Sequence, residues 1–270
     1  MTIRSIKAHD IPMIASAMAG RNESPKDRCG YIGSDIEGIA RYLNEIYEDG
    51  GSILISRDGL VAGDVVDDNR SVEVIGPYAD SVIAVNELIE ELRYRHPSYD
   101  LLFFVDKEND KVIQAVTALG GTAEEHWEME RELIEEEEID PHIRPYRRGE
   151  FVYHLHDELF PRAYYAGRSL EEMSLSDQGK LAVYKDGSDI LGYIFYQTDP
   201  GYIDFLGVTE SARKQGIGSK LLAYACQDAW DEGARHIQMS VRKINPAGLA
   251  FMEKHGFTIA EENIALRLRG

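Results

Sequence analysis

The segment LGVTESARKQGIGSKLL (residues 206–222) passes from an apolar stretch through a cationic, glycine-containing loop into a helical pattern. A turn between a buried strand and a helix leaves several backbone N–H groups unpaired at the positive end of the helix. Gly216 and Gly218 let an anion approach the backbone without meeting a Cβ atom, while Arg213 and Lys214 add positive charge. The loop therefore predicts a binding site for a diphosphate.

Two other phosphate-binding motifs do not fit this loop. A P-loop ends in Gly-Lys-Ser/Thr, but Gly218 is followed by Ser219 and then Lys220. A dinucleotide fingerprint requires a third glycine where Leu221 stands. Lys220 still adds a third cation close to the glycines, so the expected ligand remains an anion.

The elements on either side of the loop follow from the pattern of apolar residues. Residues 202–208 are apolar on both faces apart from Asp204, which predicts a buried central strand. Residues 218–231 carry apolar side chains at helical spacing and end before Gly233, a frequent helix stop. We expect this apolar stripe to be core.

The chain repeats one order of elements. VDKENDKVIQAVTALGGTAEE (residues 105–125) aligns with VRKINPAGLAFMEKHGFTIAEE (residues 241–262), with Val, Asn, Gly and Thr at one constant offset. Upstream, residues 50–66 and 178–195 are both apolar runs joined by a Lys/Arg-Asp-Gly turn, which predicts two hairpins. The repeat therefore predicts two tandem copies of one domain.

Each copy is expected to contain a strand, one or two helices, a hairpin, a central strand, a helix, a strand, a helix and a terminal hairpin. This order predicts an α/β (α+β) fold in which a mixed, mostly antiparallel sheet is flanked by helices. An acidic run precedes Asp140 and Pro141, and we place the boundary there. The predicted domains are residues 1–139 and 141–270.

Composition limits the partners. The 270 residues have a formal net charge of −19, which disfavours nucleic acid and anionic membranes and favours cationic partners, although acidity also serves solubility alone. No stretch approaches a membrane span or a leader segment, so a cytoplasmic protein is expected. Cys29 and Cys226 are expected to remain reduced, and no metal is expected.

Residues 206–222, followed by VRKINPAGLAFMEKHGF (residues 241–257), resemble the acetyl-CoA half of the GNAT superfamily of N-acetyltransferases. The shared features are a strand ending in Leu-x-Val, a loop of the form Arg/Gln-x-x-Gly-x-Gly, and then Asn and Gly-Phe at fixed distances. The resemblance covers roughly residues 202–257, and the repeat extends a weaker likeness over nearly the whole chain. It implies a tandem member with two GNAT-like domains and acetyl-CoA as the acyl donor.

The resemblance also implies which residues hold the coenzyme. The pantetheine arm is expected on the backbone of Leu206, Gly207 and Val208, since a strand edge splayed open offers free N–H and C=O groups to an amide-rich ligand. Asn245 is expected either to reach the coenzyme or to cap a helix that begins at Pro246, and the two roles are compatible. The diphosphate is expected on the loop residues Arg213, Lys214, Gln215, Gly216, Ile217, Gly218 and Ser219.

The first copy lacks this loop. Its equivalent segment GPYADSVIAVNEL (residues 76–88) has no glycine pair and no basic residue, and Asp80 stands where it would repel phosphate. We therefore expect a degenerate first domain, empty of coenzyme, that serves as a scaffold or forms part of the substrate side.

The usual catalytic positions of the family are altered. A tyrosine that protonates the leaving sulfur in many relatives is replaced by Met252, and a glutamate base found in some is replaced by Ser240. Asp204 is the best remaining base because a lone carboxylate in an apolar strand must be paired, hydrated or raised in pKa, and each is more common at a functional site. Glu73 at the matching place of the first copy instead favours a structural role. Because a thiol has a pKa of about 8.5, the coenzyme thiolate can leave without a protonating acid.

Tyrosines and backbone groups complete the expected site. The backbone N–H of Leu206 or Val208 is the expected oxyanion donor. Tyr202 is a candidate acid or substrate contact, as are Tyr193 and Tyr196, although aromatic residues on strands are usually packing.

The acceptor is expected to be a small cationic amine. Its recognition is assigned to residues 159–177, whose rings and carboxylates are suited to a cation but also fit an ordinary helical surface: Tyr164, Tyr165, Glu171, Glu172 and Asp177. The favoured function is an N-acetyltransferase active in its second domain, with a homodimer possible. The alternatives are an acyl-CoA sensor without turnover and acyl transfer to an oxygen or sulfur nucleophile.

Overall fold

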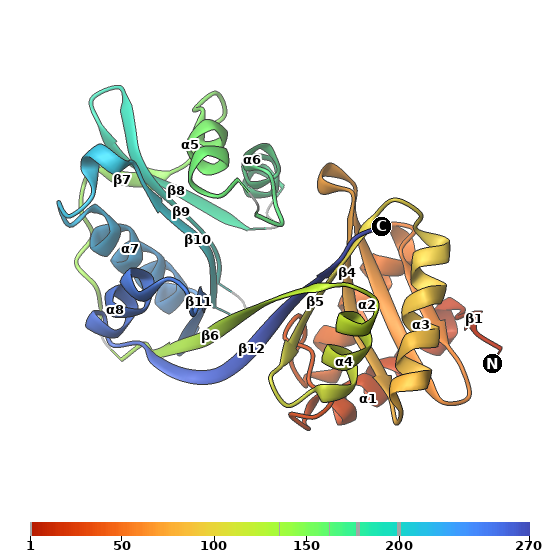
Figure 1. The fold of residues 1–270 in the computed structure, drawn as a ribbon. Coiled ribbons are helices and arrows are strands. Elements are labelled where there is room, and N and C mark those ends of the chain that lie inside the picture. The colour runs from red at the N-terminus through yellow and green to blue at the C-terminus, as the bar shows by residue number, and fades with distance from the viewer. Residues whose placement is uncertain (1, 135, 162, 177–178, 199–200) are drawn as a thin grey trace. The chain divides into compact units, whose positions relative to one another are not determined.

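A computed structural model describes residues 2–134, 136–161, 163–176, 179–198 and 201–270 (Figure 1). The chain forms two compact units. The first unit comprises Met1–His126 and Glu261–Gly270, and the second unit comprises Trp127–Ala260. No helix within the described ranges is both long and apolar enough to cross a membrane.

The first unit has a mixed sheet in the order β1-β2-β3-β4-β5-β12, flanked by helices (Figure 1). Short 3-10 turns at Ala8–Asp10 and Asp67–Asn69 join some of its elements. Its elements are β1 (Arg4–Ser5), α1 (Ile11–Asn22), α2 (Ile36–Glu48), β2 (Ser52–Ile55), β3 (Gly59–Val66), β4 (Ser71–Ala79), α3 (Val82–Arg95), β5 (Asp100–Asp106), α4 (Asp110–Ala118) and the end of β12 (Thr258–Leu268).

The second unit repeats this plan with a sheet in the order β6-β11-β10-β9-β8-β7. A 3-10 turn at Glu210–Ala212 follows its central strand. Its elements are β6 (Thr122–Glu132), β7 (Ile143–Pro145), α5 (Val152–Leu159), α6 (Gly167–Leu175), β8 (Lys180–Asp186), β9 (Asp189–Gln197), β10 (Tyr202–Val208), α7 (Ile217–Asp231), β11 (His236–Arg242) and α8 (Pro246–Lys254). The predicted tandem fold is therefore confirmed.

The last strands of the two sequence copies are exchanged: β6, from the first copy, lies in the sheet of the second unit, and β12, from the second copy, lies in the sheet of the first unit. In the first unit β12 runs antiparallel to β5, with Ile264 opposite Val105 and Leu268 opposite Leu101. In the second unit β6 lies next to β11. The compact units divide near residues 126 and 260. The boundary predicted at Asp140 concerns the two sequence copies, and it stays a prediction.

The second unit has one apolar core on each face of its sheet. One core contains the apolar stripe of α7, including Leu221 and Cys226, and packs against Met252 of α8. The other core contains Val152 of α5 and Leu170 of α6. Helices therefore cover both faces, and the central strand β10 lies between two cores.

Candidate functional site: a splayed strand, a glycine loop and a buried carboxylate

Strand β10 diverges from its neighbour β11 after two residues. It pairs with β9 along its whole length, from Tyr202 to Val208, but pairs with β11 only at Tyr202 and Ile203. From Asp204 onward, the backbone of β10 no longer pairs with β11. The backbone of Leu206 and Val208 thus belongs to a splayed edge of the kind that an extended, amide-rich ligand can join.

A β-bulge lies at the point where the two strands separate. The register between β10 and β9 shifts between Ile203 and Phe205, which leaves Asp204 as the extra residue. Gly207, after the bulge, cannot carry a side chain, since a Cβ atom there would lie 2.5 Å from the ring of Tyr193 and 2.9 Å from Leu159. The apolar wall behind β10 therefore fixes the glycine that the sequence places at the end of the strand.

The glycine loop has the geometry of an anion site. Lys214 and Gly216 both have positive φ, 61° and 81°, and α7 begins directly after Gly216. The first intrahelical bond runs from the N–H of Lys220 to Gly216 O, so the amides of the preceding first turn have no partner within the helix. Arg213 and Lys214 are exposed. A cation and free amides therefore meet at one helix N-terminus.

The glycine loop and the splayed edge come together at Gly218. A Cβ atom on Gly218 would lie 3.5 Å from the ring of Phe251 in α8 and 3.6 Å from Leu206 in β10. The structure thus brings the predicted diphosphate residues beside the predicted pantetheine residues, which the family resemblance implies for one ligand.

Several side chains in or near the loop have partners within the protein. Arg213 Nε donates to Val208 O at 3.3 Å, and Gln215 Nε2 donates to Ser211 O at 3.1 Å. Lys220 pairs with Asp140 at 2.7 Å and lies over the ring of Tyr184, so the expectation that it supplies charge to the loop is wrong. The Ser219 hydroxyl lies 2.8 Å from Nε2 of His255. Asn245 caps α8, because its side chain accepts the N–H of Gly248 at 2.9 Å. The capping role expected of Asn245 is thereby present, and its contact with coenzyme stays a prediction.

Asp204 is held in an apolar surrounding by two hydrogen bonds. Its Oδ1 accepts the hydroxyl of Tyr164 at 2.6 Å, and its Oδ2 accepts the amide of Gln197 at 3.4 Å. Burial raises the pKa of Asp204 to about 6, against the two hydrogen bonds, which lower it. A carboxyl group with this pKa is ionised at pH 7 and still basic enough to accept a proton.

The three candidate tyrosines have different environments. Tyr193 is bonded to His156 at 2.6 Å, and Tyr196 is bonded to Asp228 at 2.8 Å, so both belong to packing networks. Burial raises the pKa of Tyr202, and the negative charges of Glu128 and Asp204 raise it further. Of the three, Tyr202 alone remains a candidate for the chemistry.

The residues predicted to bind a cation do not lie together in the structure. Tyr164 lies against Asp204, and its ring centroid is 5.2 Å from that of Phe205. Tyr165 contributes its carbonyl oxygen to Nε2 of His156 at 3.0 Å. Asp177 lies outside the described residues. Tyr164 is therefore the member of the predicted group that the structure places at the carboxylate.

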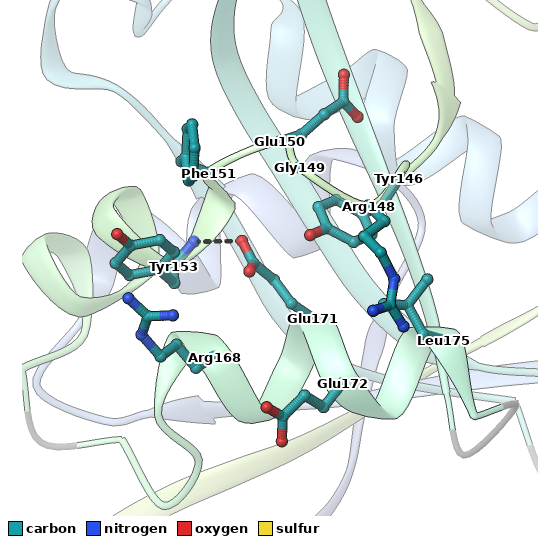
Figure 2. A pocket seen from close by; sticks show the side chains of 10 residues that line it. All are labelled: Tyr146, Arg148, Gly149, Glu150, Phe151, Tyr153, Arg168, Glu171, Glu172 and Leu175. Carbon is teal, nitrogen blue, oxygen red and sulfur yellow. Dashed lines mark hydrogen bonds between the residues drawn. The ribbon is translucent and has the colours of Figure 1, made fainter.

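Glu171 and Glu172 instead line a pocket of about 340 Å³ beside α5 and α6 (Figure 2). Glu171 accepts the N–H of Tyr153 at 3.0 Å and so satisfies the first turn of α5. The guanidinium of Arg168 lies 4.2 Å from the centre of the Tyr153 ring. A cation of the protein thus covers the Tyr153 ring beside the two glutamates that were expected to bind a substrate cation.

The corresponding gap in the first unit is filled by the chain itself. There β4 pairs with β5 only from Ser71 to Glu73. Beyond that point residues 28–30 lie along β5: the N–H of Gly30 donates to Phe104 O at 2.7 Å, and the N–H of Asp106 donates to Arg28 O at 3.2 Å. Cys29 between them forms an isolated bridge with Val105.

Buried polar groups anchor this inserted segment. The Asn22 side chain donates to Cys29 O at 3.1 Å and accepts both the Cys29 N–H and the Tyr78 hydroxyl. Asn109, the counterpart of Asn245, caps α4 and lies 3.4 Å from Arg28 O. Asp80 pairs with Arg21 at 2.6 Å. The segment was not foreseen from the sequence, because nothing local marks residues 28–30 as a strand.

The chain is similar to a known family and to solved structures. Residues 140–257 match the model of the acetyltransferase (GNAT) family. A GCN5-related N-acetyltransferase from Sphaerobacter thermophilus is similar in structure, with a TM-score of 0.70 and 19% identity, over 99% of this chain and 95% of that one. A search of curated proteins finds no match.

Two more solved structures cover nearly both chains. A tandem GNAT protein from the clavulanic acid biosynthesis pathway has a TM-score of 0.67 and 12% identity, over 99% of this chain and 98% of that one. A GNAT-family acetyltransferase from Colwellia psychrerythraea has a TM-score of 0.57 and 15% identity, over the whole of both chains. At these identities the likeness shows the fold. The described residues contain no group of three or more His, Cys, Asp or Glu side chains suited to a metal ion.

Proposed function

We propose that the second unit, in which residues 140–257 match the model of the GNAT acetyltransferase family, transfers the acetyl group of acetyl-CoA to the primary amine of a small, cationic acceptor. The observation that carries the proposal is the junction at Gly218, where the glycine loop meets the splayed edge of β10. The acyl chain that fits is acetyl, by resemblance to the family.

The residues present suit acetyl-CoA as a substrate. The free amides of Gly216 and Gly218, with Arg213 and Lys214, hold the diphosphate. The backbone of β10 from Leu206 to Val208 pairs with the amides of the pantetheine arm, as an added strand pairs with a sheet edge. Asn245 contributes the remaining amide hydrogens of its side chain while it caps α8.

The chemistry is direct attack within the second unit. Asp204 takes a proton from the acceptor ammonium, the amine nitrogen attacks the thioester carbonyl, and the C–N bond forms. The C–S bond then breaks, and the departing thiolate takes up the second proton of the nitrogen. The N–H of Leu206 or Val208 stabilises the oxyanion. The thiolate leaves without an acid at Met252, whose side chain is only 2% exposed and packs in the core.

The first unit has no coenzyme site in this proposal. Residues 28–30 lie along β5 where β4 has separated from it, with Cys29 Sγ 3.8 Å from Val74 O of β4, so they fill the gap that a pantetheine arm would enter. The side chain of Asn109 donates to Arg28 O of the same segment. The unit is then a scaffold that supplies β6 to the second sheet.

A non-catalytic sensor is the second candidate. It is favoured by one observation: Met252 and Ser240 stand where relatives carry an acid and a base. A sensor would hold acyl-CoA in the same loop but release no thiol.

Calorimetry with CoA, followed by an assay of thiol release over a panel of polyamines, aminoglycosides and amino acids, tests these alternatives. We expect one CoA per chain, and turnover with a polyamine or an aminoglycoside, with an N-acetylated product identified by mass spectrometry. Binding without turnover favours the sensor, and an acetylated hydroxyl or thiol contradicts the amine. The absence of heat on adding CoA contradicts both candidates.

A further inference from the structure

Ser219 lies in the first turn of α7, within the loop that the proposed function assigns to the diphosphate. It is the third residue of the helix, after Ile217 and Gly218, and the first intrahelical bond begins at Lys220. The Ser219 N–H is therefore one of the free amides at the positive end of α7. Its side chain reaches a neighbouring helix, because Oγ lies 2.8 Å from Nε2 of His255 at the end of α8.

The second ring nitrogen of His255 determines where the protons of this pair lie. Nδ1 lies 2.7 Å from the backbone oxygen of Phe251, one turn earlier in α8. A carbonyl oxygen only accepts, so Nδ1 carries a proton in the neutral ring as well as in the charged ring. In the neutral ring Nε2 is then the acceptor, and the Ser219 hydroxyl donates to it. The hydroxyl proton is thus directed at His255 and not at an anion in the loop.

One added proton reverses the hydrogen bond between Ser219 and His255. When Nε2 is protonated it donates to Oγ of Ser219, and the hydroxyl proton is released to donate to another acceptor. The charged ring also places a positive charge one hydrogen bond away from the loop, and hydrogen bonds that involve a charged group are stronger than neutral ones. The protonated pair therefore offers a diphosphate one more donor and one more positive charge than the neutral pair does.

The charged groups on the elements next to His255 are paired with one another or exposed to solvent. In α7, β6 and α8 these are, in order, Lys220 with Asp140, Arg131 with Glu137, and the exposed Glu253 and Lys254. Among the residues that the structure describes, none forms an ion pair with His255. The cations Arg213 and Lys214 of the loop disfavour a charged ring, and a bound diphosphate offsets their charge. Binding of the anion therefore favours protonation of His255.

Resting on the proposed coenzyme site, we infer that His255 is a positioning residue that takes up a proton when CoA binds and thereby turns the Ser219 hydroxyl toward the diphosphate. The affinity for CoA then depends on pH through a side chain outside the glycine loop. The inference holds whether the second unit transfers the acyl group or only senses it. Because linkage is reciprocal, a ligand whose binding takes up a proton binds more weakly as the pH rises.

His255→Gln tests this inference, with His236→Gln as a matched control at an exposed histidine of β11. Glutamine keeps a hydrogen-bonding side chain but takes up no proton. We expect the wild type and H236Q to lose about tenfold more CoA affinity between pH 6 and pH 8 than H255Q loses. Calorimetry in buffers of different ionisation enthalpy should show that they also take up more protons on binding. The 3′-phosphate of CoA titrates near about pH 6 as well, but its contribution is common to all the variants.

Ser219→Ala supplies an independent arm, which also decides the question if H255Q does not fold. Without the hydroxyl, a proton on His255 adds no donor to the ligand, so S219A should show the weak pH dependence of H255Q, and the double variant should match either one. Wild-type pH dependence of CoA affinity in H255Q or in S219A overturns the inference and leaves the coenzyme site standing. A wild-type chain that binds no CoA overturns the proposed function, and the inference with it.

Discussion

Asp204 shows how one residue can serve chemistry at the expense of stability. The bulge that separates β10 from β11 leaves its carboxylate among aromatic side chains, with one tyrosine and one glutamine as partners. Burial raises the pKa of Asp204, so the charged form is less favourable in the folded chain than in the unfolded one. The sequence showed that this carboxylate lies in a central strand, but not that it occupies a bulge.

Asp204→Asn separates the two effects. We expect kcat to fall by about 10²- to 10⁴-fold, since a positioned base contributes that much. Wild-type activity should fall as pH drops through about 6, the pKa of Asp204, and D204N should lose this limb of the profile. A D204N variant with near wild-type kcat would assign the base elsewhere.

The same substitution makes a prediction about stability. A carboxyl group with a raised pKa favours the folded state below its unfolded pKa, and this contribution is lost as pH rises through the folded pKa. D204N should therefore unfold at the same or a higher denaturant concentration than the wild type at pH 8. Urea midpoints at pH 8 and pH 5 measure the difference, which should shrink at pH 5.

His156 gives a second pH dependence, of opposite sign. It is fully buried, bonded to Tyr193 and to the carbonyl of Tyr165, and burial lowers the pKa of His156. A histidine with a lowered pKa stabilises the fold at pH values above its pKa in the unfolded chain, about 6.5. This contribution is lost as the pH falls below that value toward the pKa in the folded chain. We expect His156→Gln to lower stability at pH 7.5 and to flatten the loss between pH 7 and 5, as followed by urea unfolding.

At the scale of elements, the glycine loop was predicted well because its signals are local. Glycines, cations and a helical stripe are adjacent in sequence, and the structure places α7 where the pattern predicts it. Lys220 was misassigned because its partner Asp140 is distant in sequence. Tyr193 and Tyr196 were candidates only because residue type alone does not show which network a phenol joins.

Gly218→Ala tests the loop without straining it. The added methyl would meet Phe251 at ordinary contact distance, 3.5 Å, so the fold should tolerate it, but the methyl would stand where the diphosphate approaches. We expect CoA affinity to fall by at least about tenfold, equivalent to about 1.4 kcal/mol. Gly20→Ala in α1, where nothing lies within 4 Å, is the matched control and should bind CoA normally in calorimetry.

At the scale of the whole molecule, the sequence predicted the repeat but not the partner of each terminal strand. Strand pairing depends on residues distant in the chain, so neither β12 beside β5 nor β6 beside β11 is marked locally. For the same reason the sequence did not predict that residues 28–30 lie along β5.

Fragments cut at the predicted boundary should therefore fail to fold. Residues 141–270 lack Met129 and Leu133 of the second core, and residues 1–139 lack Leu266 and Leu268 of the first. Loss of even one such leucine costs about 2–5 kcal/mol. We expect neither fragment to show cooperative urea unfolding, in contrast to the full chain. A folded 141–270 fragment that binds CoA would show that the exchanged strand is dispensable.

The two cysteines fall one in each unit, and both are fully buried. Burial raises the pKa of Cys29 to about 11 and that of Cys226 to about 12, so neither thiol reacts while its surroundings stay closed. Cys29 becomes reactive only when residues 28–30 leave β5, and Cys226 only when α7 lifts from its sheet. Alkylation rates at the two sulfurs, measured by peptide mapping, thus monitor the opening of each half separately, and saturating CoA should slow labelling at Cys226 while leaving Cys29 unchanged.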